Sequence, residues 1–561
     1  MVVRVMTAGA PRVTAPALRK GQEQNPKPLA VSVRKSAVWS MSSTILLRLA
    51  SIGVTAVVAR ILTPQDFGVF AVATTVYTIV SALGEFGVGS CLSRADLDVD
   101  ALAPTMWSVS LVTSSIVAAI MVLFAKPIAS SLGSADGAGP VRVMAITMIL
   151  IGVTAVPTAQ CTREYKQGKI FLANVISFFP STIVLFVLAK SGDGAMAFAW
   201  SRIAGQFTSC VVMLASAGRL YVPGLTRYAF GVLLKFGLPW AGANFVGYIL
   251  QNVDYAFIGH LMGPATLGSY VVAFNAASWS SSLLFGVIYA VAIPTFSRVK
   301  EDPAKLADAM ANGVRAIVLI AAPMCFLSMV LARPLVSTIY GARWSSSAAV
   351  LSVLSLYGLI SVVCILFSNM IAALGKSNFI LIVQLIWLAA LVPAMAIGVR
   401  EDGMVGAAVA HIIVLVPIVL PCYLIALKRA ARVRLVNIMK AVSPSIISAS
   451  VAAFIAWTAA SVMHGSFFKL VAGLAAGGLF YMLATAPQLI FVFGNKYTHN
   501  PLVCRILRFY RITGRTIGIP VGPPPKHASA GPRPSSAPNT APVTPRLQGH
   551  HRTPRPRRLP G

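Results

Sequence analysis

The sequence predicts an all-α polytopic membrane protein of about fourteen transmembrane helices, with two six-helix lobes and two extra C-terminal helices. Three observations predict this fold. Hydrophobic residues make up 57% of the chain and charged residues only 11%, whereas an average soluble domain carries about 25% charged residues. Long apolar segments recur along the chain, and one stretch repeats 200 residues later. Such a chain has too little polar surface to cover a water-soluble particle.

Fourteen apolar segments are long enough to cross a membrane, since a helix needs about 20 residues to span the hydrocarbon. The first begins at residue 37 and is too long for the core of a signal peptide, so we interpret it as a spanning helix. The fifth and sixth are separated only by SGDG. The segments lie approximately at residues 37–62, 67–92, 104–125, 141–161, 171–190, 195–215, 236–262, 266–293, 312–332, 346–373, 378–399, 403–427, 441–463 and 467–493.

The Lys and Arg residues are distributed unequally between the two sides of these segments. With the N-terminus in the cytoplasm, 36 of the 46 Lys and Arg fall in inner segments and seven in outer loops. Cytoplasmic loops of membrane proteins carry such an excess. We therefore expect both termini to be cytoplasmic, which agrees with an even number of helices. All outer loops are short, so no folded domain is expected there.

The two ends of the chain are polar and basic. Residues 1–36 form a basic cytoplasmic arm, and residues 495–561 carry twelve Lys and Arg with no acidic residue. The tail is rich in Pro, Ser and Gly, which predicts disorder. Its charge would also suit nucleic acid, but positive tails are already expected at this membrane face, so we predict no nucleic-acid partner. The seven Cys and seven His show no metal-binding spacing, and no cofactor is predicted.

The internal repeat places RILTPQDFGVFAVA (60–73) on HLMGPATLGSYVVA (260–273). Pro64 aligns with Pro264, and Gly68 aligns with Gly268. Because six is an even number, two six-helix halves would point the same way, a layout that secondary transporters use with the substrate site between the halves. The expected parts are a first lobe at 37–215, a cytoplasmic linker at 216–235, a second lobe at 236–427 and two additional helices at 428–494.

Polar side chains form one face on several of these apolar segments. Polar faces inside a bilayer turn toward protein or a wet cavity rather than lipid. In the first segment they recur at helical spacing, and in the seventh they occupy the same positions plus 200. The second segment has such a face near Glu85, and the sixth contains Arg202. The cleft candidates are Thr44, Arg48, Ser51, Thr55, Arg202, Asn244, Tyr248, Gln251 and Asn275.

Arg48 is the most unusual of these residues, because it lies in the middle of the first apolar segment. An unpaired arginine at the bilayer centre costs at least about 2.5 kcal/mol, so Arg48 needs a compensating group. Two alternatives remain open: Arg48 binds an anionic group of the substrate, or it forms an ion pair with Glu85 or Asp254. Asp254 and Glu85 are also candidates for proton or sodium coupling.

The stretch at residues 59–94, which contains ARILTPQDFGVF, resembles the polysaccharide transporter branch of the multidrug/oligosaccharidyl-lipid/polysaccharide exporter superfamily. The family pattern R-x-L-x-P-x-x-F/Y-G-x-F/Y appears as Arg60, Leu62, Pro64, Phe67, Gly68 and Phe70. Residues 254–277 resemble the second-half counterpart, and residues 334–344 resemble the loop between the ninth and tenth helices. The resemblance covers roughly residues 36–430.

This resemblance implies a flippase that moves an undecaprenyl-pyrophosphate-linked oligosaccharide from the inner to the outer leaflet of the bacterial cytoplasmic membrane. Its implied role is exopolysaccharide, O-antigen or capsule synthesis. The implied partners are the lipid-linked oligosaccharide, membrane lipids, and a polymerase and glycosyltransferases of the same pathway. A guanidinium suits a pyrophosphate through paired hydrogen bonds, and Asn, Gln, Ser, Thr and Tyr suit sugar hydroxyls.

Two other transport functions stay open: an ion-coupled drug exporter of the same superfamily, and a flippase for a peptidoglycan lipid precursor. A drug exporter would favour organic cations and an acidic or apolar cleft, which Arg48 argues against. The sequence does not separate the peptidoglycan alternative. A membrane enzyme such as a saccharide polymerase would need a large external loop with catalytic residues, so we expect no enzyme.

Overall fold

The computed structural model describes residues 46–84, 87–92, 99–164, 166–217, 223–279, 303–374, 377–431 and 435–493. These residues are almost entirely helical and belong to one compact unit, Met1–Thr498. Among them, nine helical stretches are long and apolar enough to cross a membrane. The predicted all-α polytopic class is confirmed at this level, whereas the count of fourteen helices and the two lobes stay predictions.

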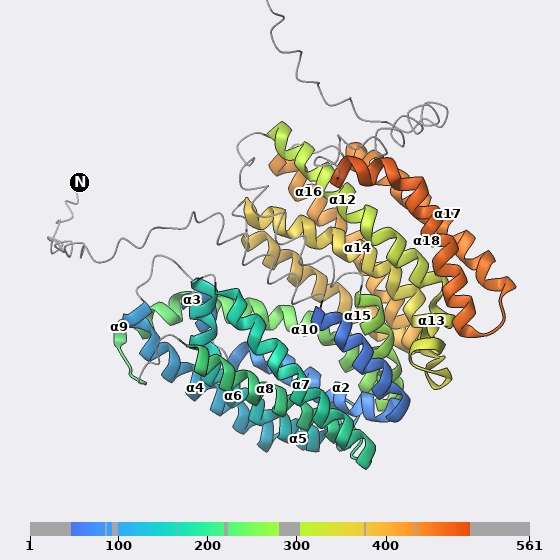
Figure 1. Cartoon of the computed structure of the whole chain (residues 1–561). Coiled ribbons are helices and arrows are strands. Elements are labelled where there is room, and N and C mark those ends of the chain that lie inside the picture. Colours follow the sequence, from blue (N-terminus) through green and yellow to red (C-terminus); the bar gives the residue numbers. More distant parts are fainter. Residues whose placement is uncertain are drawn as a thin grey trace, which may run out of the picture. The chain divides into compact units, whose positions relative to one another are not determined.

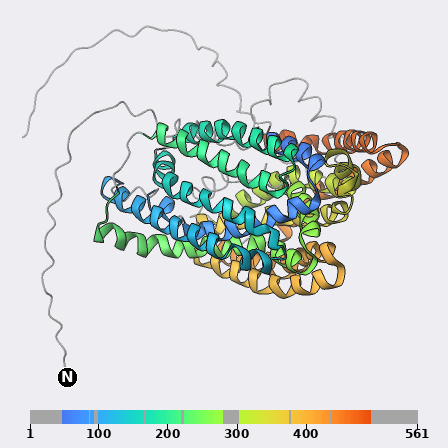
Figure 2. The same cartoon turned by 90° about the horizontal axis from the view of Figure 1, so that it is seen from below.

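Helices of the first half follow the predicted apolar segments. Residues 46–61 are helical. They are followed by α2 (Pro64–Gly84), α3 (Val88–Leu92), α4 (Val99–Leu123), α5 (Ala125–Ser131), α6 (Ala138–Arg163), α7 (Gln167–Ser191) and α8 (Ala195–Ser216). The short helix α5 lies in a predicted outer loop and was not expected. Helices α4, α6, α8 and α7 pack in that order, and they run side by side in Figures 1 and 2.

The second half begins with α9 (Arg227–Val232) and a π-helical turn, Leu233–Gly237, that leads into α10 (Leu238–Met262). Residues 264–279 are helical. After them come α12 (Pro303–Val330), α13 (Ala332–Ile339), α14 (Ser347–Ala373), α15 (Ser377–Val414), α16 (Leu420–Ala431), α17 (Leu435–Val462) and α18 (Ser466–Phe493). A second π-helical turn, Leu415–Val419, separates α15 from α16.

Two glycines interrupt the long helices. Gly87, with φ of 72°, lies between α2 and α3. Gly403, with φ of 53°, breaks α15 internally, and Asp402 before it also leaves the helical region. Only glycine adopts positive φ without strain, so a long apolar run turns where these residues occur. The segments predicted at 378–399 and 403–427 therefore meet at Gly403.

Helix α10 connects the two halves of the chain, because it packs on α2 from the first half and on α15 from the second (Figure 1). The largest buried apolar cluster likewise includes residues of both halves, among them Val72, Tyr270, Trp344 and Phe367. On the outside, α7 exposes a row of large apolar side chains: Leu172, Ile176, Phe179, Ile183 and Val187. A soluble protein rarely exposes such a face, whereas lipid accommodates it.

Helices α17 and α18 form a closely packed pair that rests on α12. A Cβ atom at Gly477 would lie 2.7 Å from the carbonyl oxygen of Ala452, so only glycine allows this approach. Small residues at such interfaces let transmembrane helices come close enough for extensive van der Waals contact. The hydroxyl of Tyr481 also donates to the carbonyl oxygen of Leu319 on α12, at 2.8 Å.

Candidate functional site

Arg48 lies on the 46–61 helix and is half-buried. Its Nη2 donates a hydrogen bond to the hydroxyl oxygen of Ser278, on the 264–279 helix, at 2.7 Å. Its Nε is buried without a hydrogen-bond partner among the described residues. Within the same part of the chain no carboxylate forms an ion pair with Arg48. The guanidinium therefore carries a charge inside an apolar bundle that no described side chain compensates.

Asp254, on α10, is fully buried and is held by its own set of partners. Its Oδ2 accepts a hydrogen bond from the hydroxyl of Tyr270 at 3.0 Å and lies 3.4 Å from His411 Nε2. Its Oδ1 accepts from the backbone N–H of Tyr255 at 2.9 Å. The expected alternative of an ion pair between Arg48 and Asp254 is therefore not what the structure contains. Glu85, the other expected partner, lies outside the described residues.

His411, on α15, was not singled out in the sequence analysis. Only 3% of its surface is exposed, and its Nδ1 has no hydrogen-bond partner in the described part of the chain. Its ring is close to those of Tyr357 and Phe274, with centroid distances of 4.7 and 6.4 Å. A lone histidine in the apolar run GAAVAHIIVLV is the same kind of signal as Arg48, because ionisable residues within spanning segments are rare and functional.

A cavity of about 520 Å³ lies beside these groups, between α10, the 264–279 helix, α14, α15 and α16. Ser278 lines it, so the residue that binds Arg48 also borders the cavity. Its volume lies in the range of about 300–1,000 Å³ typical of ligand pockets. The polar and aromatic lining residues include Gln251, Ser278, Tyr357, Gln384, Trp387 and His411.

The other predicted residues of the first segment make only local hydrogen bonds. Ser51 donates to the carbonyl oxygen of Arg48, and Thr55 donates to that of Ser51, both at 2.8 Å. Such bonds to the preceding turn satisfy a hydroxyl within its own helix. Thr44 lies outside the described residues. Neither Ser51 nor Thr55 lines the cavity.

Of the candidate residues predicted in the seventh and eighth segments, only one lines the cavity. Gln251 lines the cavity and donates to the carbonyl oxygen of Gly247 at 3.4 Å. Tyr248 is partly buried, whereas Asn244 and Asn275 are exposed. The structure therefore brings Gln251 together with Ser278, His411 and, through Ser278, Arg48. It does not bring Asn244 or Asn275 to the cavity.

Arg202, on α8, has a partner that the sequence pattern did not reveal. Its guanidinium carbon lies 5.0 Å from the ring centre of Tyr77 on α2. A cation over an aromatic face is stabilised by about 0.5–2 kcal/mol, depending on solvation. Arg202 is exposed and does not line the cavity. Its position is thus explained by packing on α2.

The halves meet through pairs of reciprocal contacts, which we call the clasp: Arg60, Pro64, Gly68, Ser131, His260, Pro264, Gly268 and Thr338. A Cβ at Gly68 would lie 1.7 Å from the carbonyl oxygen of Pro264, and a Cβ at Gly268 would lie 1.9 Å from that of Pro64. Arg60 Nη2 donates to Thr338 O at 2.6 Å, and His260 Nδ1 lies 2.9 Å from Ser131 O.

These contacts involve a second similarity between the halves, which was not predicted. The short helices α5, AKPIASS (125–131), and α13, ARPLVST (332–338), match at an offset of 207 residues. Ser131 and Thr338 are the equivalent positions, and each receives the aligned residue of the other half, His260 or Arg60. Helices of seven or eight residues are too short to cross a membrane, so they are easily overlooked when a sequence is searched for spanning segments.

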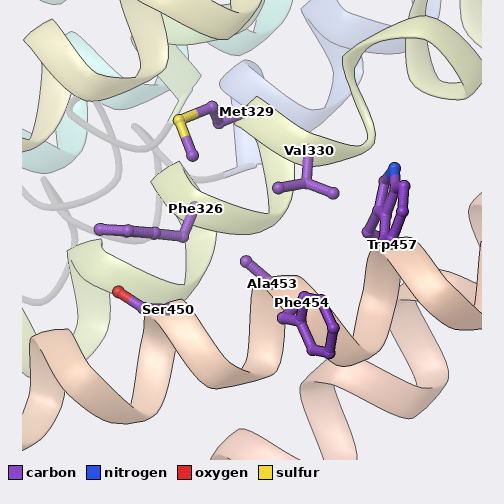
Figure 3. A pocket seen from close by; sticks show the side chains of 7 residues that line it. All are labelled: Phe326, Met329, Val330, Ser450, Ala453, Phe454 and Trp457. Atoms are coloured by element: carbon purple, nitrogen blue, oxygen red, sulfur yellow. The ribbon is translucent and has the colours of Figure 1, made fainter.

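A second hollow is an open groove of about 370 Å³ between α12 and α17, shown in Figure 3. Phe326, Met329 and Val330 line it from α12, and Phe454 and Trp457 line it from α17. Its only hydroxyl within the described lining belongs to Ser450, which donates to the carbonyl oxygen of Ile446. Apart from this hydroxyl and the indole N–H of Trp457 the described lining is apolar, which suits a lipid better than a sugar or phosphate.

The polysaccharide biosynthesis protein family model matches residues 57–349, more than half of the chain. The chain belongs to this family. The match includes the clasp residues from Arg60 to Thr338, the cavity residue Gln251 and the buried carboxylate of Asp254.

Curated relatives of this family member come from several bacteria. The succinoglycan biosynthesis transport protein ExoT of Rhizobium meliloti (strain 1021) is 25% identical over 67% of this chain and 76% of its own length. The lipopolysaccharide biosynthesis protein WzxC of Escherichia coli (strain K12) is 22% identical over 67% of this chain and 77% of its own. The teichuronic acid biosynthesis protein TuaB of Bacillus subtilis (strain 168) is 20% identical, covering 62% and 72%.

Solved structures show that the fold of this family member is that of known membrane transporters. The lipid II flippase MurJ in an inward closed conformation aligns with a TM-score of 0.60 and 13% identity, covering 82% of this chain and 99% of its own. An inward-facing multidrug resistance transporter of the MATE family and the MOP superfamily aligns with a TM-score of 0.52 and 16% identity, covering 72% and 99%. At these identities the likeness concerns the fold alone.

Proposed function

We propose that this protein is a flippase, which moves a polyprenyl-pyrophosphate-linked oligosaccharide across the bacterial cytoplasmic membrane by alternating access. The product would serve exopolysaccharide, O-antigen or capsule synthesis. Family membership supports this proposal, as do the names of the relatives, which concern transport or biosynthesis of succinoglycan, lipopolysaccharide and teichuronic acid. The single observation that carries it is the uncompensated Arg48 guanidinium beside a polar cavity in a transporter fold.

Arg48 is proposed to bind the pyrophosphate of the lipid carrier. A guanidinium presents paired N–H donors that match phosphate oxygens, and its Nε has no partner within the described protein. In a water-poor bundle this attraction is stronger than in solvent. Of the remaining predicted cleft residues, Gln251 lines the cavity and would contact the saccharide. The path to the cavity is proposed to pass Thr44, Ser51, Thr55, Asn244, Tyr248 and Asn275, whereas Arg202, also predicted for the cleft, packs on Tyr77.

The proposed architecture has two six-helix lobes at 37–215 and 236–427, with a linker at 216–235 and additional helices at 428–494. The clasp supports this division, because equivalent positions of the two halves make equivalent contacts with the opposite half. Gly68 and Gly268 do so, as do Arg60 and His260, and bodies related by a two-fold axis contact each other in this way. With the Lys and Arg bias, the clasp lies at the outer end and both termini, 1–36 and 495–561, are cytoplasmic.

Asp254 is the proposed coupling site for a proton, with His411 as its neighbour. The buried carboxylate accepts a hydrogen bond from Tyr270 and lies 3.4 Å from the imidazole of His411, and ionisable groups inside a membrane often form proton relays. Glu85 stays a second candidate for ion coupling. No cofactor is required by this scheme, and a pathway polymerase and glycosyltransferases remain proposed partners.

An export measurement on cells without the gene tests the flippase proposal. We expect the polyprenyl-linked oligosaccharide to accumulate, with its sugar accessible only from the cytoplasmic side, as determined by mass analysis of extracted lipids. Wild-type protein should clear the intermediate. Arg48→Ala should lower export by about tenfold to a hundredfold, because it removes hydrogen bonds to a charged group. Arg48→Lys should restore only part of the export activity that Arg48→Ala loses, since an ammonium group lacks the paired N–H donors of a guanidinium.

The control is Arg142→Ala, which removes an exposed cation of α6 that does not line the cavity. It should export normally at equal membrane levels. Accumulation of a peptidoglycan precursor instead would assign a different cargo. Absence of any lipid-linked intermediate in the deletion strain would refute the flippase proposal, and normal export by Arg48→Ala would remove Arg48 from the site.

A further inference from the structure

The cavity beside Arg48 has an uncharged lining that is both polar and aromatic. Within the described lining there is no Asp, Glu, Lys or Arg, and His411 is its single basic residue. Tyr357, Trp387 and Tyr423 contribute aromatic rings, and Gln251 and Gln384 contribute amides. The described lining therefore offers no carboxylate to pair with an organic cation and no Lys or Arg to pair with an anion.

Two hydrogen-bonding groups in this lining are buried without a partner among the described residues: Trp387 Nε1 and His411 Nδ1. An indole N–H is only a donor, whereas an imidazole nitrogen donates or accepts according to its tautomer. A buried unpaired polar group is costly, so both atoms favour a ligand that offers hydroxyl groups at the cavity.

Other groups of the lining keep free hydrogen-bonding capacity after their internal bonds. The amide nitrogen of Asn369 donates to the carbonyl oxygen of Ile365 at 2.9 Å, and that of Gln251 donates within its own helix. Each bond uses the NH₂ group and leaves the amide oxygen able to accept. Hydroxyl donors of a polyol match such acceptors, and aromatic rings match its apolar C–H faces.

We propose that this cavity binds one pyranose ring of the lipid-linked saccharide, next to the pyrophosphate held by Arg48. The inference rests on the proposed flippase function and adds a sugar-binding site to it. Ser278 connects the two subsites, because it lines the cavity and accepts the hydrogen bond of Arg48. The phosphate and the first sugar of such a lipid are directly bonded, so neighbouring anionic and polyol subsites match its chemistry.

Photo-crosslinking in cells that make their own polysaccharide tests the site whichever sugar the saccharide contains. Trp387 is replaced by the photoreactive residue p-benzoylphenylalanine, and Ser51, one turn from Arg48, is replaced in a second variant. The matched control is the same replacement at Trp457, whose indole lines the groove between α12 and α17 (Figure 3). Adducts are purified after irradiation and analysed by mass spectrometry for sugar fragments.

The expected result is a saccharide-containing adduct at position 387 and only phospholipid at position 457. Capture of saccharide at 51 but not at 387 would overturn the sugar site and leave the flippase proposal intact. Capture of saccharide at neither position, or equally at 457, would overturn the inference. Absence at both 51 and 387 would also contradict the flippase proposal.

A milder variant measures the contribution of the indole N–H. Trp387→Phe keeps an aromatic ring and removes the donor, so export at equal membrane levels should fall about fivefold, as expected for one neutral hydrogen bond. Trp457→Phe should leave export unchanged. Unchanged export in Trp387→Phe would mean that its N–H does not bind the substrate.

Discussion

At the scale of single residues, the hydrogen-bond partners of Arg48 and Asp254 indicate the proposed role of each residue. Arg48 has a neutral partner, the Ser278 hydroxyl, so its positive charge is available to a ligand. Asp254 has partners on three sides, Tyr270, His411 and a backbone N–H, so it does not neutralise Arg48. Their separate environments suit two different tasks, anion binding and proton transfer.

The proton proposal predicts how Asp254→Asn responds to ion gradients. Wild-type export should fall when a protonophore collapses the proton gradient and should persist when a sodium ionophore acts alone. Asp254→Asn keeps the size of the side chain but cannot ionise, so its export should be about tenfold lower and insensitive to the protonophore. The measurement is the rate at which lipid-linked saccharide is cleared from the inner leaflet.

Asp308→Asn is the matched control, because Asp308 is an exposed carboxylate of α12 away from the cavity. It should keep both the rate and the protonophore sensitivity of the wild type. If export by the wild-type protein is indifferent to both gradients, Asp254 is not a coupling site. Sensitivity to sodium alone would exclude the proton and assign a different ion.

At the scale of helices, the clasp depends on backbone contact between α2 and the 264–279 helix. Both helices begin with a proline, Pro64 or Pro264, followed four residues later by a glycine. Proline is pre-organised for the first helical turn, and glycine lets the facing carbonyl approach. Equivalent residues are used on both sides, so loss of either glycine should have a similar effect.

We expect Gly68→Ala and Gly268→Ala each to lower the thermal unfolding midpoint of the detergent-solubilised protein. The added Cβ would lie 1.7 or 1.9 Å from a carbonyl oxygen, and backbone displacement of this kind typically costs about 1–3 kcal/mol. Gly53→Ala is the control, because a Cβ at Gly53 meets no described atom within 4 Å. Equal midpoints for all three variants would show that the glycine contacts do not hold the helices together.

At the scale of the whole molecule, the clasp is the proposed outer closure of an alternating-access cycle. Cysteines at positions 131 and 260 would join the two halves where His260 meets the Ser131 carbonyl oxygen. Oxidation of the double variant should stop export, and a reductant should restore it, because the transporter could not open outward. Each single cysteine variant should be insensitive to oxidation. Continued export after complete cross-linking would contradict this role.

Much of this molecule could be predicted from the amino-acid sequence, because each helix that crosses a bilayer needs about 20 predominantly apolar residues in succession. The helical membrane class, the positions of the long helices and the correspondence of Pro64 with Pro264 follow from local pattern. The polar character of Arg48, Gln251 and Asp254 was evident for the same reason. Lone residues such as His411 and Trp387 gave no spacing pattern, so their place beside Asp254 and the cavity was not predicted.

The sequence by itself determined where the long helices lie and which of them carry polar groups, since both depend on residue types close together along the chain. Only the tertiary structure decided which polar groups meet. Asp254 pairs with His411, 157 residues away, and Arg48 reaches Ser278, 230 residues away. Contacts of this kind depend on helix packing angles and rotations, which a one-dimensional pattern does not encode.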